Sequence, residues 1–321
     1  MEVYFNRNFW NRRSEGGIPG VPKPADWEFT YDGSRYFIPK IYQFPEGVTI
    51  DIINILDNEK LKFFYDKYAP IEDEMNEEEN LVAEQERPIP ELPLHDVYIN
   101  DHPTEIKSSS VSYISFLNKK WYEEVLSEIK KEYGLSDEES FQCIRVHVEY
   151  SNESQKKISR IKLLTSKTDE LIPVKRHFKV ENKASDNQYD VVFRHPLTEE
   201  EYHLYIAEAE FKDIRLVFPH YDQSEPYNNA MIKYELVPPL PKDERIAVRE
   251  IKQKDIKDRN YAAVIGYISN GETGKNGYPI EYAISNMYWK ALEFAEFSIV
   301  GIYKTKCTEK EIVVFDEQNF K

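Results

Sequence analysis

Cysteine is scarce in this sequence: its 321 residues include only Cys143 and Cys307. The two lie far apart along the chain and lack the short spacing of a zinc site. A disulfide scaffold is not expected in a chain of this length, and two free thiols fit a reducing compartment. We therefore expect a cytoplasmic protein.

Long apolar runs are also missing. No stretch approaches the ~18 apolar residues that span a bilayer, and the longest candidate, 261–268, has the length of a strand. The N-terminal residues 1–8 contain no apolar core of a secretion signal. We expect a soluble protein without a membrane partner.

Dense blocks of lysine and arginine are absent too, and the formal net charge is −16. The stretches 156–157 and 252–257 are short, and acids surround them. A surface of this charge repels nucleic acid and anionic membranes on average. An unknown small molecule or another protein is therefore the expected partner, and nucleic acid is not.

Aromatic residues, in contrast, are abundant: they form 14% of the chain and include 23 tyrosines. Tyr and Phe favour strands, where a flat side chain packs on a pleated surface. Two aromatic runs, 27–31 and 36–42, flank Asp32-Gly33, which is a strong hairpin signal.

Short strands joined by short loops are predicted for nearly all of the chain from Leu171 onward. The predicted strands are 171–180, 189–194, 202–208, 213–218, 231–237, 245–251, 261–269, 281–289, 296–304 and 310–315. Many short strands without intervening helices indicate antiparallel sandwiches or barrels.

Two segments have helical patterns. Apolar residues recurring every three to four positions predict a helix near 58–68, and a wide apolar stripe closed by Gly134 predicts another near 119–133. The strongly acidic segment 70–92 ends in several prolines, and we expect an exposed loop there.

The predicted fold is therefore mainly β, with antiparallel sandwich-like lobes and two α-helices. The favoured division is an N-terminal β-rich lobe at 1–167, which contains both helices and the acidic loop, and a C-terminal antiparallel β lobe at 168–321. A single α+β domain is the alternative.

Two local patterns suggest chemistry. A predicted strand at 141–150 places Cys143 on the same face as Arg145 and His147, where cations can activate a thiol; a small buried strand residue is the alternative. The loop 270–277 suggests a phosphate loop, but Gly-Lys is followed by Asn276 instead of Ser or Thr. A hairpin loop is expected there.

Three of the seven histidines, His195, His203 and His220, are the main catalytic candidates. If 189–194 and 201–208 pair, His195 occupies the turn and His203 the second strand. Three imidazoles could bind zinc or supply an acid–base pair. No His-x-His or His-Glu-x-x-His motif supports this, so structural histidines are the other interpretation, and we expect no metal and no cofactor.

The polar loop 222–229 contains an aromatic residue. A stacking ring beside amides that bind hydroxyl groups suits recognition of a sugar or peptide. The candidate binding residues are therefore Tyr221, Asp222, Tyr227 and Asn228; an ordinary connection between strands is the alternative.

Four short motifs follow one another in this part of the chain. They are His195-Pro196-Leu197-Thr198, His203-Leu204, Phe218-Pro219-His220-Tyr221 and Tyr234-x-Leu236-x-Pro238-x-Leu240. Their order resembles a family of uncharacterised bacterial proteins of gut anaerobes, over roughly the C-terminal half of the chain. Glu199 stands where that family usually has glycine. The resemblance implies a bacterial protein and groups these histidines with Tyr221, but it implies no activity.

Three functions are consistent with these patterns, and the third is a purely structural subunit, which would expose a large apolar patch and form a stable oligomer. The first, which we favour, is a non-enzymatic binding or interaction protein that uses its aromatic strand faces and the 222–229 loop. The second is a metal-assisted or histidine-based hydrolase centred on His195, His203 and His220. Ring nitrogens that converge within about 4 Å would favour the hydrolase, because zinc–nitrogen bonds measure ~2.0–2.1 Å.

Overall fold

Two compact units form the chain. The computed structural model describes residues 2–10, 17–115, 123–182, 189–216, 226–251 and 271–317. Unit 1 comprises 1–70, 86–168 and 306–321, and unit 2 comprises 71–85 and 169–305. The segment 71–85 thus belongs to unit 2 although it precedes residue 168, and 306–321 belongs to unit 1 although it follows.

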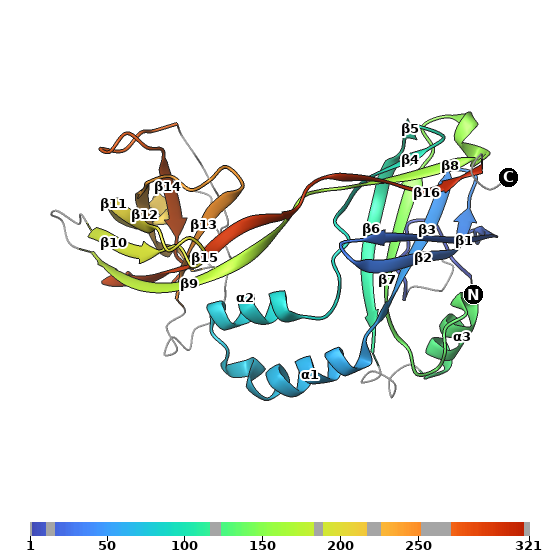
Figure 1. Cartoon of the computed structure of the whole chain (residues 1–321), viewed down its shortest axis with the longest axis horizontal. Helices are drawn as coiled ribbons and strands as arrows, with labels where there is room; N and C mark the ends of the chain where they lie inside the picture. Colours follow the sequence, from blue (N-terminus) through green and yellow to red (C-terminus); the bar gives the residue numbers. More distant parts are fainter. Residues whose placement is uncertain are drawn as a thin grey trace. The chain divides into compact units, whose positions relative to one another are not determined.

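Unit 1 contains two sheets (Figure 1). The five-stranded sheet has the order β1-β2-β3-β7-β6, with β1 at Val21–Tyr31, β2 at Ser34–Gln43, β3 at Gly47–Leu56, β7 at Ser140–Glu149 and β6 at Glu105–Ile114. The second has the order β16-β8-β4-β5, with β16 at Lys310–Asp316, β8 at Arg160–Thr165, β4 at Leu94–Ile99 and β5 at His102–Pro103. The expected mainly β, antiparallel fold is confirmed.

The core of unit 1 lies between these sheets because alternate strand residues point inward. Ile50 and Val146 of the larger sheet share a cluster with Ile161 and Val314 of the smaller one. The opposite face of the larger sheet packs on α3 (Glu123–Tyr133), where Ile129 is buried. The unit therefore has a sheet–sheet core and a helix on one outer face.

The β1–β2 hairpin follows the sequence prediction. Tyr31 pairs with Ser34 across the turn, and Asp32 and Gly33 have φ values of 45° and 76°. A two-residue hairpin turn that matches the strand twist needs positive φ at both positions, which Asp-Gly provides.

Unit 2 is built from two further sheets. One has the order β10-β11-β12-β14, with β10 at Tyr189–Arg194, β11 at Glu201–Asp213, β12 at Asn228–Val237 and β14 at Ile280–Ile284. The other has the order β13-β15-β9, with β13 at Glu244–Glu250, β15 at Phe294–Cys307 and β9 at Thr168–Glu181. Leu204 and Ile232 of the first sheet share one core with Phe297 and Ile299 of the second.

The helix prediction near 58–68 is confirmed by α1 (Asn58–Tyr68). The described part of the second predicted helix is α3, which ends before Gly134 at φ 70°. Its predicted start at 119 lies outside the described residues.

The prediction of an exposed loop at 70–92 is wrong. This segment contains a 3-10 helix, η1 (Ala69–Glu74), and a third α-helix, α2 (Glu77–Glu86). Leu81 of α2 packs with Leu171, Ala247 and Val300 on the outer face of the β13-β15-β9 sheet. The helix is stabilised by packing against strands that lie far away in the sequence, and the local count of charges does not reveal this contact.

Three strand predictions need correction or fall outside the description. The strand expected at 213–218 is instead the end of β11 and a 3-10 turn, η4 (Ile214–Leu216). The strand expected at 281–289 ends at Ile284, and the one at 261–269 lies outside the described residues. A further 3-10 turn, η3, spans Glu153–Lys156. No helix of the described chain is long and apolar enough to cross a membrane.

Candidate functional site

Helix α1 forms one wall of a groove in unit 1. Asp57 caps its start by accepting hydrogen bonds from the backbone N–H groups of Glu59 and Lys60 at 3.0 and 3.1 Å, which satisfies donors that a helix start leaves unpaired. Leu61 is buried beneath the helix. Phe63, two positions later, is 72% exposed. The helix therefore anchors one face and presents an aromatic ring on another.

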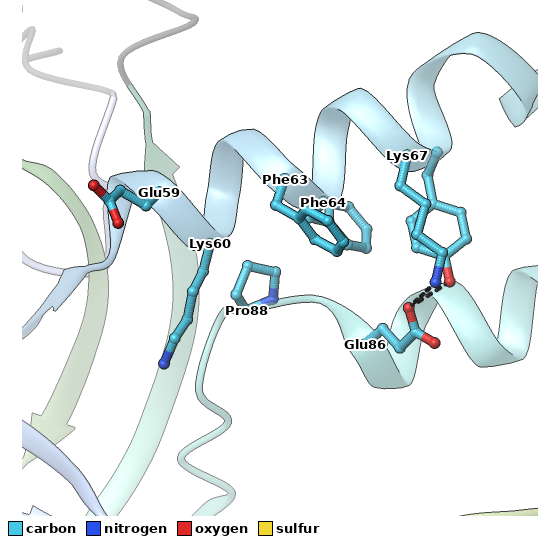
Figure 2. A pocket seen from close by; sticks show the side chains of 8 residues that line it. Glu59, Lys60, Phe63, Phe64, Lys67, Glu86 and Pro88 are labelled. Carbon is cyan, nitrogen blue, oxygen red and sulfur yellow. Dashed lines mark hydrogen bonds and ion pairs between the residues drawn. The ribbon is translucent and has the colours of Figure 1, made fainter.

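The opposite wall is the short segment that contains Glu86 and Pro88. Lys67 and Tyr68 of α1 both donate hydrogen bonds to one Glu86 oxygen, the tyrosine at 2.7 Å. These bonds raise the pKa of Lys67 and lower that of Glu86. The groove is thus closed at one end by an ion pair (Figure 2).

The groove itself has a volume of about 430 Å³. Its lining residues are Glu59, Lys60, Phe63, Phe64, Lys67, Tyr68, Glu86 and Pro88. In Figure 2 the rings of Phe63 and Phe64 point from α1 toward Pro88. The volume falls in the usual range of small-molecule pockets, roughly 300–1,000 Å³.

The aromatic wall of the groove is braced from within. The rings of Phe64 and Tyr68 lie 5.0 Å apart, and the Arg87 guanidinium lies 5.9 Å from the Phe64 ring centre. Such cation–π and ring contacts fix side chains that would otherwise rotate. Phe64 and Tyr68 therefore form a fixed base beside the exposed ring of Phe63.

The chemistry of this groove suits binding rather than catalysis. Three aromatic rings and Pro88 supply half of its lining residues, and the Glu86 carboxylate is already bonded to Lys67 and Tyr68. Because the pKa of Glu86 is lowered, this group stays ionised near neutrality and is a poor proton donor.

His195 lies in the turn of the predicted β10–β11 hairpin, which the structure confirms by pairing Arg194 with Glu201. Its Nδ1 accepts hydrogen bonds from the N–H groups of Leu197 and Thr198 at 3.1 and 3.2 Å. Its Nε2 lies 3.0 Å from Glu244. Nδ1 of this buried ring therefore holds the turn, and Nε2 ties the turn to β13. Within the turn, Glu199 has a φ of 61°, a conformation that favours glycine.

His203 lies on β11, on the same face as Tyr205 as predicted, and the two rings stack with centres 5.6 Å apart. Its Nδ1 is 3.0 Å from Asp190 on β10. His195 and His203 thus contact different carboxylates. His220, Tyr221 and Asp222 lie outside the described residues. Within the described residues, no cluster of three or more His, Cys, Asp and Glu side chains could hold a metal ion.

The other two candidate binding residues hold the chain near Trp289. The side-chain amide of the buried Asn228 donates to the carbonyl oxygens of Tyr288 and Trp289 at 3.4 and 3.2 Å. The ring of Tyr227 packs edge-on against Trp289. The Arg215 guanidinium lies 3.3 Å from the centre of the Tyr227 ring. The Asn228 amide therefore holds the backbone at Tyr288 and Trp289.

The glycine-rich loop is organised by a carboxylate of the protein itself. Buried Glu235 accepts hydrogen bonds from the N–H groups of Asn276 and Tyr278, the latter at 2.8 Å, and from the Asn276 amide at 2.9 Å. A side chain on Gly274 would collide with this carboxylate. The N–H groups that a phosphate loop would offer to its ligand are thus bonded to Glu235 instead. This agrees with the predicted hairpin loop.

The predicted charged face of β7 is buried in unit 1. Arg145 binds Asp51 through two hydrogen bonds at 2.7 and 2.8 Å, and the Nδ1 of His147 lies 2.7 Å from the Thr49 hydroxyl. Burial raises the pKa of the Cys143 thiol well above its ordinary value. Cys143 is therefore an unreactive core residue and not an activated thiol.

One cluster escaped the sequence reasoning because it includes the segment that was expected to be a loop. Ser298 donates its hydroxyl proton to Glu78 of α2, and the His177 Nε2 lies 3.1 Å from the same carboxylate. A nucleophilic serine needs the histidine beside it as base; here the carboxylate lies between them. The cluster holds α2 against β9 and β15, and its residues are not arranged as a catalytic triad.

The groove also escaped that reasoning, although one signal was present. The helical stripe of 58–68 left Phe63 outside the apolar face, but a single exposed apolar residue is common on protein surfaces and marks a site only where it joins a larger patch. Comparison of the chain with family models, with curated proteins and with solved structures finds no match.

Proposed function

We propose that this is a non-enzymatic binding protein whose ligand inserts a planar apolar group into the groove beside α1. The observation that carries this proposal is the 72% exposed ring of Phe63 at a cavity of about 430 Å³. Covering apolar surface is worth about 25 cal/mol per Å². A flat ring placed between Phe63 and Pro88 would remove both from water.

The ends of the groove suggest the charge of the ligand. One end is neutralised by the Lys67–Glu86 pair. At the other, which Glu59 also lines, the exposed Lys60 ammonium lies 3.9 Å from Asp57, and its side chain extends past Pro88 (Figure 2). An ammonium offers three donors. We therefore propose an aromatic ligand that carries one anionic group near Lys60.

The compartment and the source of the protein are part of this proposal. Cys143 and Cys307 are both free thiols, which supports a reducing cytoplasm. The resemblance of the central motifs supports a bacterial origin. The net charge of −16 argues against a nucleic acid as the ligand.

Binding of 8-anilinonaphthalene-1-sulfonate, an anionic aromatic dye, tests the proposal. We expect saturable fluorescence enhancement and about two- to tenfold weaker binding in Phe63→Ala, since an aromatic contact contributes roughly 0.5–1.5 kcal/mol. Binding should also be weaker in Lys60→Gln. Both residues are exposed, so neither variant should unfold. Leu197→Ala is the matched control, because Leu197 is 63% exposed in a turn of unit 2.

The proposal fails if Phe63→Ala binds the dye as the unmodified protein does, or if Leu197→Ala weakens binding equally. The histidine-based hydrolase gains no support from the described part of the chain, where His195 and His203 contact different carboxylates.

A further inference from the structure

The five-stranded sheet of unit 1 ends in an unprotected edge. Within the described residues β6 pairs only with β7, and Figure 1 shows it at the margin of the sheet. An edge strand presents unpaired N–H and C=O groups that can pair with another chain. Residues 108–114, Ser-Ser-Ser-Val-Ser-Tyr-Ile, include no charge, no proline and no glycine, although 31% of the chain is charged.

The other edges of unit 1 have the usual protection. β1 contains Pro22 and Pro24, with a register shift before Trp27, and proline cannot donate to a new strand. β16 begins with Lys310 and Glu311, and β5 is only two residues long. Edge charges and short strands oppose unwanted pairing.

The edge strands of unit 2 are also protected by charge. The charged residues on β9, β10, β13 and β14 include Lys175, Arg176, Asp190, Arg194, Arg245, Arg249 and Glu281. Among the edges that the structure describes, the uncharged stretch of β6 is therefore the exception.

The open stretch of β6 has a defined beginning. A register shift lies between Ile106 and Ser108, and Lys107 there binds Glu105 at 2.9 Å and Glu149 at 2.5 Å. Beyond this protected start, two apolar side chains of the strand face water: Val111 is 48% exposed and Tyr113 is 43% exposed. A partner strand would pair the backbone and cover both side chains.

We propose that this partner is a second copy of the chain, whose β6 pairs antiparallel with the first about a two-fold axis at Val111. The two five-stranded sheets then form one continuous sheet. In this register Val111 faces Val111 of the partner subunit, and Tyr113 faces Ser109 of the partner subunit. The two valines form an apolar cross-strand pair, and each tyrosine faces a small serine that leaves room for its ring.

Charge also favours this register. Lys107 falls opposite Ser115 of the partner subunit, so no like charges face each other along the strand. Each copy carries a net charge of −16, and charges farther apart than about 8 Å are largely screened at physiological salt. The uncharged edge is where two such copies meet with least repulsion, so the dimer should strengthen as salt rises.

Sedimentation equilibrium of the full chain at low and high salt tests this dimer. We expect a dimer favoured by salt, and a monomer for Val111→Lys, which would place two lysines face to face. Val313→Lys is the matched control, because Val313 is 42% exposed on the edge strand β16 of the same unit; it should remain a dimer. Circular dichroism checks that both variants fold.

A disulfide gives a second, independent readout. Cysteines on directly opposite strand residues lie within the range of Cα separations that a disulfide allows, roughly 4.4–6.8 Å. Under mild oxidation Val111→Cys should therefore form a covalent dimer, and Val313→Cys should not. A monomeric unmodified protein at all salt concentrations, dimers that survive Val111→Lys, or equal cross-linking at both positions would each overturn the proposal.

Discussion

The two units bury charge in different ways. Unit 1 buries an ion pair: Asp51 and Arg145 are 0% and 2% exposed, and Tyr133 donates a further hydrogen bond to Asp51 at 2.5 Å. In unit 2 the buried Glu244 carboxylate is paired with Lys304 and lies 3.0 Å from His195, but the buried carboxylates of Glu235 and Glu250 accept hydrogen bonds from backbone N–H, amide and hydroxyl groups.

This difference shows what each charge does for the fold. In unit 1 each member of the pair neutralises the other, so the loss of one leaves an uncompensated charge in a medium of low dielectric constant. In unit 2 the Glu235 carboxylate gathers N–H donors from the loop 271–279. Loss of these hydrogen bonds should loosen that loop and leave the core of the unit intact.

The largest expected effect is the loss of Arg145. Arg145→Leu leaves Asp51 buried without its partner, and we expect about 3–5 kcal/mol of destabilisation, the usual result of breaking a buried pair. Hydrogen exchange measured by mass spectrometry should show the loss of protection in the sheet peptides of unit 1 and little change in those of unit 2.

The double variant Asp51→Leu/Arg145→Leu separates charge from packing. Replacement of both partners by apolar residues is often neutral or stabilising, so this variant should recover most of the stability. If it is as unstable as Arg145→Leu alone, the pair stabilises unit 1 through its shape and hydrogen bonds rather than through charge balance, and the contrast between the units weakens.

A smaller effect is expected in unit 2 from Glu235→Gln. The variant removes the charge and turns an amide donor toward the N–H groups of Asn276 and Tyr278, at a cost of about 1–3 kcal/mol. Faster exchange should be confined to peptides covering 271–279. Glu272→Gln on the same loop is the control, because Glu272 is exposed; an equal effect there would contradict the role assigned to Glu235.

Local sequence signals predicted those parts of the fold whose interactions are local. The Asp32-Gly33 hairpin, α1 and the β10–β11 hairpin all have short-range causes: a turn with positive φ, an apolar helical stripe, and two β-rich runs around His195. The alternation along β7 likewise predicted that Cys143 and Arg145 share a face. These features need no knowledge of distant residues.

Features made by distant residues were not predictable in this way. Helix α2 depends on the contacts of Glu78 and Leu81 with β9 and β15, so its charge alone suggested a loop. The groove beside α1 forms only when the segment with Glu86 and Pro88 packs alongside this helix. The residues on its two walls lie about twenty positions apart in the chain, as the bond between Lys67 and Glu86 shows. Pairing order, which makes β6 an edge, is likewise a property of the whole sheet.

The smallest expected effect is a pH dependence of opposite sign in the two units. Burial lowers the pKa of His147 below its ordinary 6.5, and the nearby charge of Arg145 lowers it further. Its Nδ1 accepts a hydrogen bond from the Asn6 N–H, which a proton on that nitrogen would break. The stability that the neutral ring contributes is present above pH 6.5 and is lost as pH falls through the lowered pKa. Burial raises the pKa of Glu250 above its ordinary 4.5, so its contribution is fully present below pH 4.5 and is lost as pH rises through the raised pKa.

Two variants isolate these contributions. We expect the destabilisation caused by His147→Gln to shrink as pH falls below 6.5, since the protonated histidine is itself unfavourable. The destabilisation caused by Glu250→Gln, which imitates the protonated carboxyl group, should instead shrink as pH rises above 4.5. Thermal unfolding of both variants and the unmodified protein across this pH range measures each difference directly. If both differences change in the same direction with pH, burial does not shift the two pKa values in opposite directions. The difference between the two units in how they bury charged groups would then not appear in the pH dependence of their stability.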